Sequence, residues 1–327
     1  MPKISVIIPA YNAERTILET IQSVQQQTFP DWEIIVINDG SIDITLEILE
    51  SIDDPRLKIF SYQNGGLSVA RNRGISQAVG EFIAFLDADD LWTPDKLELQ
   101  LAALQQYPEA GVAYSWTYFF HEKDKILIPG VPVSYEGNVI ENLLLGNFLD
   151  NGSNPLIRKA AIESVGEFDP AFPHYADWDY YLRLAEKWNF VLVPKYQILY
   201  RQSSSSMSSK VDSIKADGLI MLEKAFTRVP QELQFLNNQS LSRLHQYYAG
   251  LYLQHNSDVM SLDKAGENLW LAITKYPKIL VNIRTQKLIL KYCLKRLLPL
   301  SLSTYLIELI RKLRVNIKYQ MENTKSN

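Results

Sequence analysis

The stretch EFIAFLDADD, residues 81–90, places three carboxylates directly after an apolar pattern that predicts a β-strand. Wound α/β sheets bind ligands at the carboxyl ends of their strands. Clustered carboxylates repel one another, and a divalent cation such as Mg²⁺ or Mn²⁺ would relieve that repulsion while bridging them to a diphosphate. A solvated acidic turn before a helix that starts at Pro94 explains the cluster equally well. The stretch alone predicts a strand end and leaves both interpretations open.

Three similar apolar runs precede this strand, and segments with helical spacing separate them, for example residues 17–24. This alternation predicts an α/β fold with a wound, mostly parallel, Rossmann-like sheet. The predicted strands are 4–9, 33–38, 57–62, 81–86, 112–120, 190–194 and 197–200, with helices at 160–165 and 177–187 in the second half. Periodicity fades over 121–151, where Pro129 and Gly130 predict a turn between two short extended pieces. We interpret this segment as an insertion that lines a pocket.

The last third of the sequence changes character, because helical patterns replace strand-like ones. We therefore predict one domain at 1–210 and an all-helical C-terminal region at 211–327, with a pair of tetratricopeptide-like helices inside 241–277. Basic residues dominate 284–318, where Glu308 is the only acid and leucine or isoleucine fills many other positions. Two interpretations fit this tail: a solvated helix face, or an amphipathic face that contacts an anionic membrane surface.

Composition excludes several classes of protein. The net charge of −4 gives no global case for nucleic-acid binding, and 46% hydrophobic with 21% charged residues is typical of a globular protein. The single cysteine, Cys293, allows no intrachain disulfide, so a reducing cytoplasm fits best. The N-terminus lacks the pattern of a secretory signal. Charged residues and a proline interrupt 288–310, which makes that stretch a poor transmembrane helix.

The ends of the first two predicted strands narrow the choice of ligand. The first strand leads into Pro9-Ala10-Tyr11-Asn12 and lacks the G-x-G-x-x-G pattern of a dinucleotide site, which argues against an NAD enzyme. The second ends at Asp39, whose carboxylate could accept the imino hydrogen of a uracil-type base. Helix capping by Ser41 and Asp43 is the competing interpretation of that segment.

Four short motifs occur in a fixed order and spacing along the first 90 residues. Together they resemble family 2 glycosyltransferases with the GT-A fold, over roughly residues 3–210. The motifs are Pro9-Ala10-Tyr11-Asn12, Asp39-Gly40-Ser41-x-Asp43, Ala70-Arg71-Asn72-x-Gly74 and Asp87-x-Asp89-Asp90. One such tetrapeptide is weak evidence, whereas four in order are specific. The resemblance implies an inverting transfer of a sugar from a nucleotide-diphosphate donor to an acceptor hydroxyl.

The resemblance also implies roles for individual residues in a donor site. The nucleoside would be held by Pro9, Tyr11 and Asp39, with Arg71 near the base or the phosphates, where a guanidinium donates paired hydrogen bonds. Asp87 would contact the ribose side, and Asp89 would ligate Mg²⁺ or Mn²⁺. The donor is expected to be a UDP-sugar.

A later segment, Ala176-Asp177-Trp178-Asp179, resembles the family's Glu-Asp-Trp-Asp pattern. The resemblance implies that Asp177 is the catalytic base and that Asp179 belongs to the substrate-binding residues. Two positions depart from the family pattern. Ala176 replaces the usual glutamate before the base, and Ser203 stands where histidine is common in the Tyr-Arg-x-His loop. A helix N-terminal acid favoured by the helix dipole is the competing interpretation of Asp177.

Three functions compete at this point. The first is a glycosyltransferase of the hexosyl or N-acetylhexosaminyl class that builds surface polysaccharide or modifies a lipid-linked glycan, at the inner face of the cytoplasmic membrane. The second is a nucleotidyltransferase, although the sequence has no basic Gly-rich N-terminal loop for a triphosphate. The third is a nucleotide-sugar-binding protein that has lost catalysis, which the departures at Ala176 and Ser203 suggest.

Overall fold

The computed structural model describes residues 1–202, 211–255, 259–299, 302–303 and 305–306. Ser203 and the tail beyond residue 306 therefore lie outside the described residues. Contacts divide the chain into two compact units, unit 1 with Met1–Met207 and Ile220–Gln234, and unit 2 with Ser208–Leu219 and Phe235–Asn327. Helix α8 (Val211–Arg228) contributes residues to both units. The predicted domain boundary after residue 210 stays a prediction.

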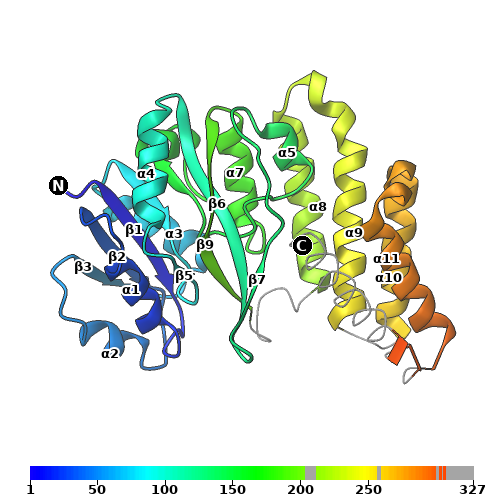
Figure 1. Cartoon of the computed structure of the whole chain (residues 1–327), viewed down its shortest axis with the longest axis horizontal. Coiled ribbons are helices and arrows are strands. Elements are labelled where there is room, and N and C mark those ends of the chain that lie inside the picture. Colours follow the sequence, from blue (N-terminus) through cyan, green and yellow to red (C-terminus); the bar gives the residue numbers. More distant parts are fainter. Residues whose placement is uncertain (203–210, 256–258, 300–301, 304, 307–327) are drawn as a thin grey trace, which may run out of the picture. The chain divides into compact units, whose positions relative to one another are not determined.

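Unit 1 is built on one mixed sheet of nine strands (Figure 1). The strands are β1 (Ile4–Ala10), β2 (Trp32–Asn38), β3 (Leu57–Ser61), β4 (Phe82–Phe85), β5 (Leu91–Trp92), β6 (Ala110–His121), β7 (Ile126–Pro129), β8 (Leu156–Arg158) and β9 (Asn189–Gln202). Their order is β3-β2-β1-β4-β8-β6-β9-β5, and β7 pairs with β6. β1 is parallel to β2 and β4, whereas β8 runs antiparallel to β4 and β6.

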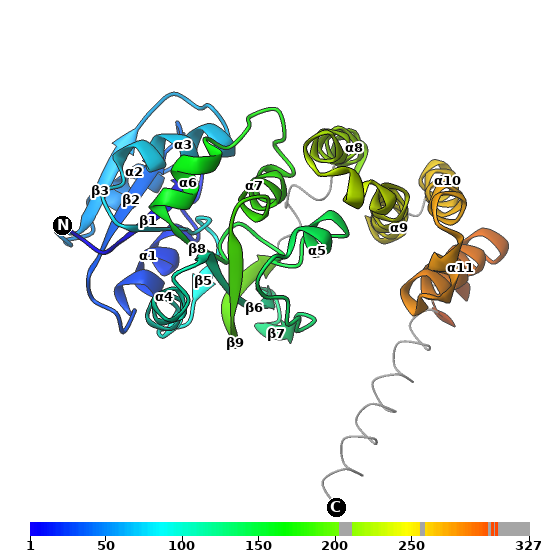
Figure 2. The ribbon, with the colours of Figure 1, turned by 90° about the horizontal axis from the view of Figure 1, so that it is seen from above.

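Every residue of β1 and β2 is buried, which is the pattern of central parallel strands covered on both faces. The helices of unit 1 before α8 are α1 (Ile17–Gln25), α2 (Thr45–Glu50), α3 (Leu67–Gln77), α4 (Lys96–Gln106), α5 (Ile140–Leu144), α6 (Lys159–Val165) and α7 (Ala176–Ala185). Figure 2 shows α1 and α4 on one face of the sheet and α3, α6 and α7 on the other. Helix α3 approaches β1 closely because Gly74 has no side chain: a Cβ there would lie 2.3 Å from Cγ2 of Ile7.

Two local predictions need correction. Residues 190–194 and 197–200 belong to one continuous strand, β9, because its register against β6 shifts at a bulge opposite Ser115 and Trp116 instead of ending there. In the segment 121–151, β6 runs on to His121 and turns back at 122–125 into β7, so the hairpin turn precedes Pro129. Lys125 supplies the left-handed backbone of this turn, with φ 50°.

Unit 2 is helical throughout its described residues, with α9 (Asn237–His255), α10 (Val259–Lys275) and α11 (Ile283–Leu297) and the short 3₁₀ helices η2 (Gln231–Leu236), shared with unit 1, and η3 (Pro277–Val281). Helices α9 and α10 pack as a pair, joined by hydrogen bonds from Ser242 Oγ to the Ala272 carbonyl (2.6 Å) and between His245 and Asn268 (2.9 Å). Among the helices that the structure describes, none combines the length and apolar character that a membrane span requires.

Candidate functional site

The carboxyl ends of β1, β2 and β4 meet at one edge of the sheet, and the predicted donor residues follow these ends. Pro9 lies in buried β1, whereas Tyr11, just beyond it, is 53% exposed. Asn12 joins the loops after β1 and β2, since its backbone N–H donates to Ser41 Oγ (3.0 Å) and its side chain accepts from the backbone N–H of Ile42 (2.9 Å). The edge therefore presents an exposed aromatic ring on a loop that is hydrogen-bonded to the loop after β2.

Asp39 follows β2 and is buried, and its carboxylate is hydrogen-bonded to other residues of the protein. Its carboxylate accepts from the backbone N–H groups of Gly65 (3.0 Å) and Gly66 (2.8 Å) and from Nη1 of Arg73 (2.7 Å). These contacts hold the loop before α3, where Gly66 adopts φ 85°. A hydrogen bond from Asp39 to a base stays a prediction, and Arg73 is a partner that the motif comparison did not identify.

The centre of the site is a buried arginine between two acids. Arg71 on α3 is 2% exposed, and its Nη2 donates to Oδ1 of Asp87 at 2.7 Å. Arg71 also interacts electrostatically with Asp177, which lies on α7. Residues separated by more than 100 positions in the sequence are thus brought together. The guanidinium of Arg71 pairs with Asp87 and its positive charge also acts on Asp177, while its contact with base or phosphate stays a prediction.

Gly152 leaves the space that Arg71 occupies, and no sequence motif singles it out. A Cβ at this position would lie 2.1 Å from Nη2 of Arg71 and 2.9 Å from its Cζ. Changing Gly152 to alanine should therefore displace the guanidinium from both acids. We expect a loss of about 1–3 kcal/mol in the free energy of unfolding, because overpacking a buried site forces such shifts, and a lower kcat for sugar transfer.

Thermal unfolding and steady-state kinetics of Gly152→Ala measure the two effects. Gly250→Ala is the matched control, because its added Cβ would make an ordinary contact of 3.7 Å with Leu288. Wild-type Tm and kcat for Gly152→Ala would contradict the packing argument.

The three acids after β4 differ in their surroundings. Asp90 is fully buried, accepting from Ser153 Oγ (2.5 Å) and from the backbone N–H of Arg201 (2.9 Å). Burial, together with nearby Asp89, raises its pKa well above the ordinary value. Asp90 therefore joins the loop to β9 and is a structural residue. Asp89 is exposed as a residue, but its carboxyl group is partly desolvated. This desolvation and the negative charge of Asp87 raise its pKa to about 6.

Asp89 is the residue of this cluster that fits a divalent cation. Desolvation is the main cause of its raised pKa, the negative charge of Asp87 adds to the rise, and a cation would relieve that repulsion. Within the described residues, no group of three or more histidine, cysteine or acidic side chains forms a metal site. A cation bound to Asp89 would thus need further oxygen ligands from a diphosphate and from water, as Mg²⁺ commonly does.

Arg201 fixes the main chain at Asp89. Its Nε donates to the Asp89 carbonyl (2.7 Å), while its Nη1 and Nη2 pair with Glu122 and Glu19, each at 2.7 Å. Burial of the Tyr200 ring raises the pKa of its phenol, and the nearby carboxylates add to the rise. The Tyr-Arg part of the resemblance marked these two positions, but it assigned Arg201 no role. The structure identifies it as the residue that orients the metal-ligand candidate.

Asp177 lies in the first turn of α7, and both oxygens of its carboxylate accept hydrogen bonds. Its Oδ1 accepts from the backbone N–H of Trp178 (2.8 Å) and its Oδ2 from Nδ2 of Asn147 (3.3 Å). Burial raises the pKa of Asp177, the positive charge of Arg71 acts against the rise, and the charge of Asp87 adds to it. The side chain keeps partial exposure. Its raised pKa and partial exposure make Asp177 the candidate for a general base.

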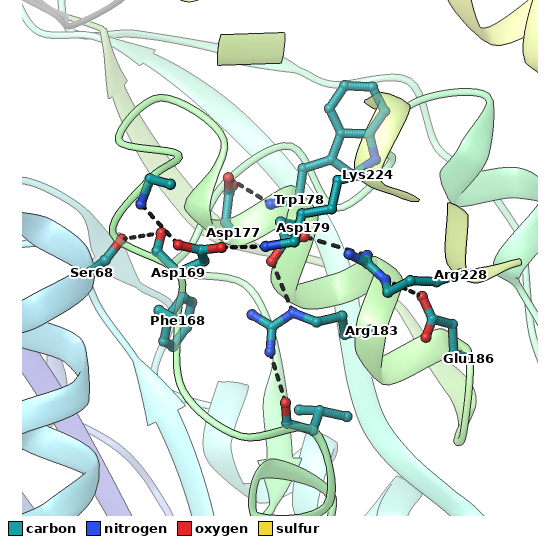
Figure 3. A network of polar contacts seen from close by, with 12 residues as sticks. Ser68, Phe168, Asp169, Asp177, Trp178, Asp179, Arg183, Glu186, Lys224 and Arg228 are labelled. Carbon is teal, nitrogen blue, oxygen red and sulfur yellow. Dashed lines mark hydrogen bonds and ion pairs between the residues drawn. The ribbon is translucent and has the colours of Figure 1, made fainter. Parts of the chain in front are cut away.

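Asp179, two residues further, has a different position (Figure 3). It is 1% exposed and pairs with Arg183 (2.8 Å) and Arg228 (3.4 Å). Because these contacts lie inside the protein, Asp179 does not face the site beside Asp177. Its predicted contact with substrate is untested. Ala176, at the position of the family glutamate, is 3% exposed.

Residues 5–250 match the model of the family described as "Glycosyltransferase like family 2". The match covers most of the chain, and the chain belongs to this family. It is 43% identical over 119 residues to TuaG of Bacillus subtilis strain 168, whose name refers to teichuronic acid biosynthesis, covering 36% of this chain and 46% of TuaG. It is 42% identical over 102 residues to WfgD of Escherichia coli, covering 31% and 40%. The chain thus spans less than half the length of these two relatives.

Solved structures show the same fold at low sequence identity. S. aureus TarS 1–349 in complex with UDP-GlcNAc gives a TM-score of 0.53 at 20% identity, covering 84% of this chain and 92% of that one. Mannosyltransferase PcManGT from Pyrobaculum calidifontis, in complex with GDP-Man and Mn²⁺, gives 0.59 at 18% identity, covering 94% and 85%. The predicted GT-A fold with a helical C-terminal region is confirmed.

Proposed function

We propose that this chain is an inverting glycosyltransferase that moves a sugar from a UDP-sugar to an acceptor hydroxyl. The observation that carries the proposal is the grouping of Asp177, Arg71 and Asp87 at the strand edge where the donor loops end. The donor assignment is supported by a structural neighbour that holds UDP and by WfgD, whose name describes a transfer from UDP-Glc. The names UDP and UDP-Glc belong to the descriptions of TarS and WfgD. For this chain they are a reason to test UDP-sugars first.

The reaction that this geometry suits is a single displacement. Asp177 takes the proton of the acceptor hydroxyl while the hydroxyl oxygen forms a bond to the anomeric carbon. The bond from that carbon to the diphosphate breaks, the nucleoside diphosphate leaves, and the configuration inverts. Arg71 stabilises Asp177 in its charged form before the proton arrives. A divalent cation held by Asp89 would offset the charge of the diphosphate.

The acceptor class is also part of the proposal. WfgD is named for transfer to a diphosphoundecaprenol-linked sugar, and TuaG for teichuronic acid biosynthesis. We propose a saccharide or lipid-linked glycan acceptor for this chain, in surface polysaccharide synthesis. We propose that the transferred sugar is a hexose or an N-acetylhexosamine.

A donor screen tests the proposed function. The protein is incubated with UDP- and GDP-sugars, Mn²⁺ or Mg²⁺, and a panel of saccharide acceptors, and the released nucleotide is measured. We expect release of UDP that increases when the acceptor is present. Pyrophosphate release would indicate a nucleotidyltransferase instead, and donor binding without turnover across the panel would indicate a binding protein that has lost catalysis.

Unit 2 carries a surface that suits a peripheral membrane contact. Three exposed apolar residues, Ile283, Leu290 and Leu297, recur at intervals of seven along α11, which places them on one stripe about 21 Å long. The helix has no acidic residue, and its basic residues are Arg284, Lys287, Lys291, Lys295 and Arg296. We propose that this stripe contacts the anionic inner face of the cytoplasmic membrane, since apolar burial and positive charge act together there.

Sedimentation with liposomes tests the membrane contact. Serine at Ile283, Leu290 and Leu297 together should lower binding to vesicles of phosphatidylglycerol and phosphatidylcholine at least about tenfold, because each buried aliphatic side chain contributes about 1.5–3 kcal/mol when fully removed from water. Vesicles of phosphatidylcholine alone should bind the wild type weakly.

The matched control replaces three exposed apolar residues of unit 1, Leu18, Ile44 and Val79, with serine. Equal liposome binding by the α11 triple variant and the wild type would show that this stripe does not contact the membrane. Concentration-dependent dimerisation of the wild type that the α11 variant loses, without liposome binding, would assign the stripe to a second copy of the chain instead.

A further inference from the structure

The second half of α8 carries two basic residues that pair with the segment around α7 (Figure 3). Lys224 pairs with Asp169 at 2.5 Å, and Arg228 pairs with Glu186 at 2.9 Å and with Asp179 at 3.4 Å. All of these residues belong to unit 1, although Lys224 and Arg228 follow the predicted end of the glycosyltransferase domain at residue 210. The contacts connect a segment predicted to lie outside that domain to its proposed catalytic helix.

Asp169 lies in the loop that leads into α7. Besides Lys224, its carboxylate accepts from the backbone N–H of Ala171 (2.9 Å), and its carbonyl accepts from Ser68 Oγ of α3 (3.3 Å). The neighbouring Phe168 exchanges two hydrogen bonds with the side chain of Asn72, at 2.8 and 2.9 Å. The loop is therefore held from one side by α3, which carries Arg71, and from the other side by α8.

Asp179 needs its two arginines for an energetic reason. A buried carboxylate with no cationic partner costs several kcal/mol, and Asp179 is 1% exposed. Arg183 lies one turn later on the same helix, while Arg228 comes from α8. Asp177 and Asp179 share the first turn of α7, so a shift of Asp179 moves Asp177 with it.

We propose that Arg228 and Lys224 are positioning residues that hold the first turn of α7, and with it the carboxylate of Asp177, in register with Arg71 and the donor edge. This inference rests on the proposed function of Asp177 as the base. It extends the catalytic unit to residues 220–228 of α8 and explains why Asp179 is aspartate at a position that faces the interior. A misplacement of a catalytic group by about 1 Å costs up to about 100-fold in rate.

The test compares variants of the full chain whose wild type has first been shown to transfer sugar. Arg228→Ala should lower kcat by about 10- to 100-fold while the donor Kd stays within about twofold, because the donor loops are on other elements. Arg228→Lys keeps one charge near Asp179 and should restore part of kcat. Lys224→Met should lower kcat in the same direction by less, since Asp169 keeps its other contacts.

Lys215→Ala is the matched control on the same helix, because Lys215 pairs with Glu267 of unit 2. It should keep the wild-type kcat. If Arg228→Ala does not fold, Arg228→Lys and Lys224→Met decide the question, since both retain most of the buried contacts.

Wild-type kcat in these variants, or equal losses of donor affinity and kcat, would overturn the positioning role while leaving the proposed function intact. Failure of the proposed function would show earlier, as a wild-type protein without transfer.

Discussion

Replacing Asp177 with asparagine is expected to remove sugar transfer while the donor still binds. Asparagine keeps the shape of the side chain and its acceptor oxygen but cannot take the proton of the acceptor hydroxyl. Loss of a general base typically costs about 10²–10⁴ in rate. Donor affinity should change little, because the predicted nucleoside contacts come from the loops after β1 and β2.

Kinetics with saturating donor, together with calorimetric titration of the donor, measure both parts of this result. Asp95→Asn is the control, since Asp95 is a partly exposed aspartate paired with Lys195 away from the site. An Asp177→Asn variant with wild-type kcat would place the base elsewhere. In the wild type, activity should fall as the pH falls through the pKa of Asp177, which burial raises above that of an ordinary aspartate.

Replacing Asp89 with asparagine is expected to abolish the contribution of Mg²⁺ or Mn²⁺ to donor binding. The amide removes the negative charge that would attract the cation, while Arg201 still holds the carbonyl of residue 89. Donor Kd measured with and without metal should differ for the wild type and coincide for the variant. Asp95→Asn serves again as the control, because Asp95 pairs with Lys195 and belongs to none of the donor motifs. Metal-dependent donor affinity in Asp89→Asn equal to that of the wild type would remove the metal assignment.

The pH dependence of metal binding follows from the same residue. Because desolvation and Asp87 raise the pKa of Asp89 to about 6, the carboxylate is protonated below that pH and the cation must displace a proton. Metal affinity should therefore fall as the pH is lowered through about 6. A metal affinity that stays flat between pH 5 and 8 would show that Asp89 is not the ligand, because a carboxylate with a pKa of about 6 changes its charge within that range.

The sequence was sufficient to predict the core of the fold because that core is locally encoded. The runs that became β1 and β2 are apolar on both faces, and helical spacing in residues 17–24 matches α1. Prediction was less reliable where contacts with residues distant in the sequence determine the local structure. The predicted gap between the strands 190–194 and 197–200 was wrong, because pairing with β6 carries β9 through a bulge.

The candidate site divides in the same way. The motifs identified the residues at the carboxyl edge of the sheet, because each motif lies in or next to a segment that follows one of the strands β1 to β4. They did not indicate that Gly152 makes room for Arg71, or that Arg201 holds the carbonyl of Asp89. Such contacts join positions 80 or more residues apart and depend on side-chain packing. Asp179 is a further example, since its partner Arg228 lies 49 residues away.

The measurement that tests the central claim most directly is the configuration of the sugar released from an α-linked UDP-hexose. Proton NMR follows the anomeric signals during slow donor hydrolysis, before mutarotation mixes them, and it requires no knowledge of the natural acceptor. A single displacement assisted by Asp177 predicts that the β-anomer forms first, together with an equal amount of UDP. The α-anomer forming first, or pyrophosphate appearing in place of UDP, would contradict the account.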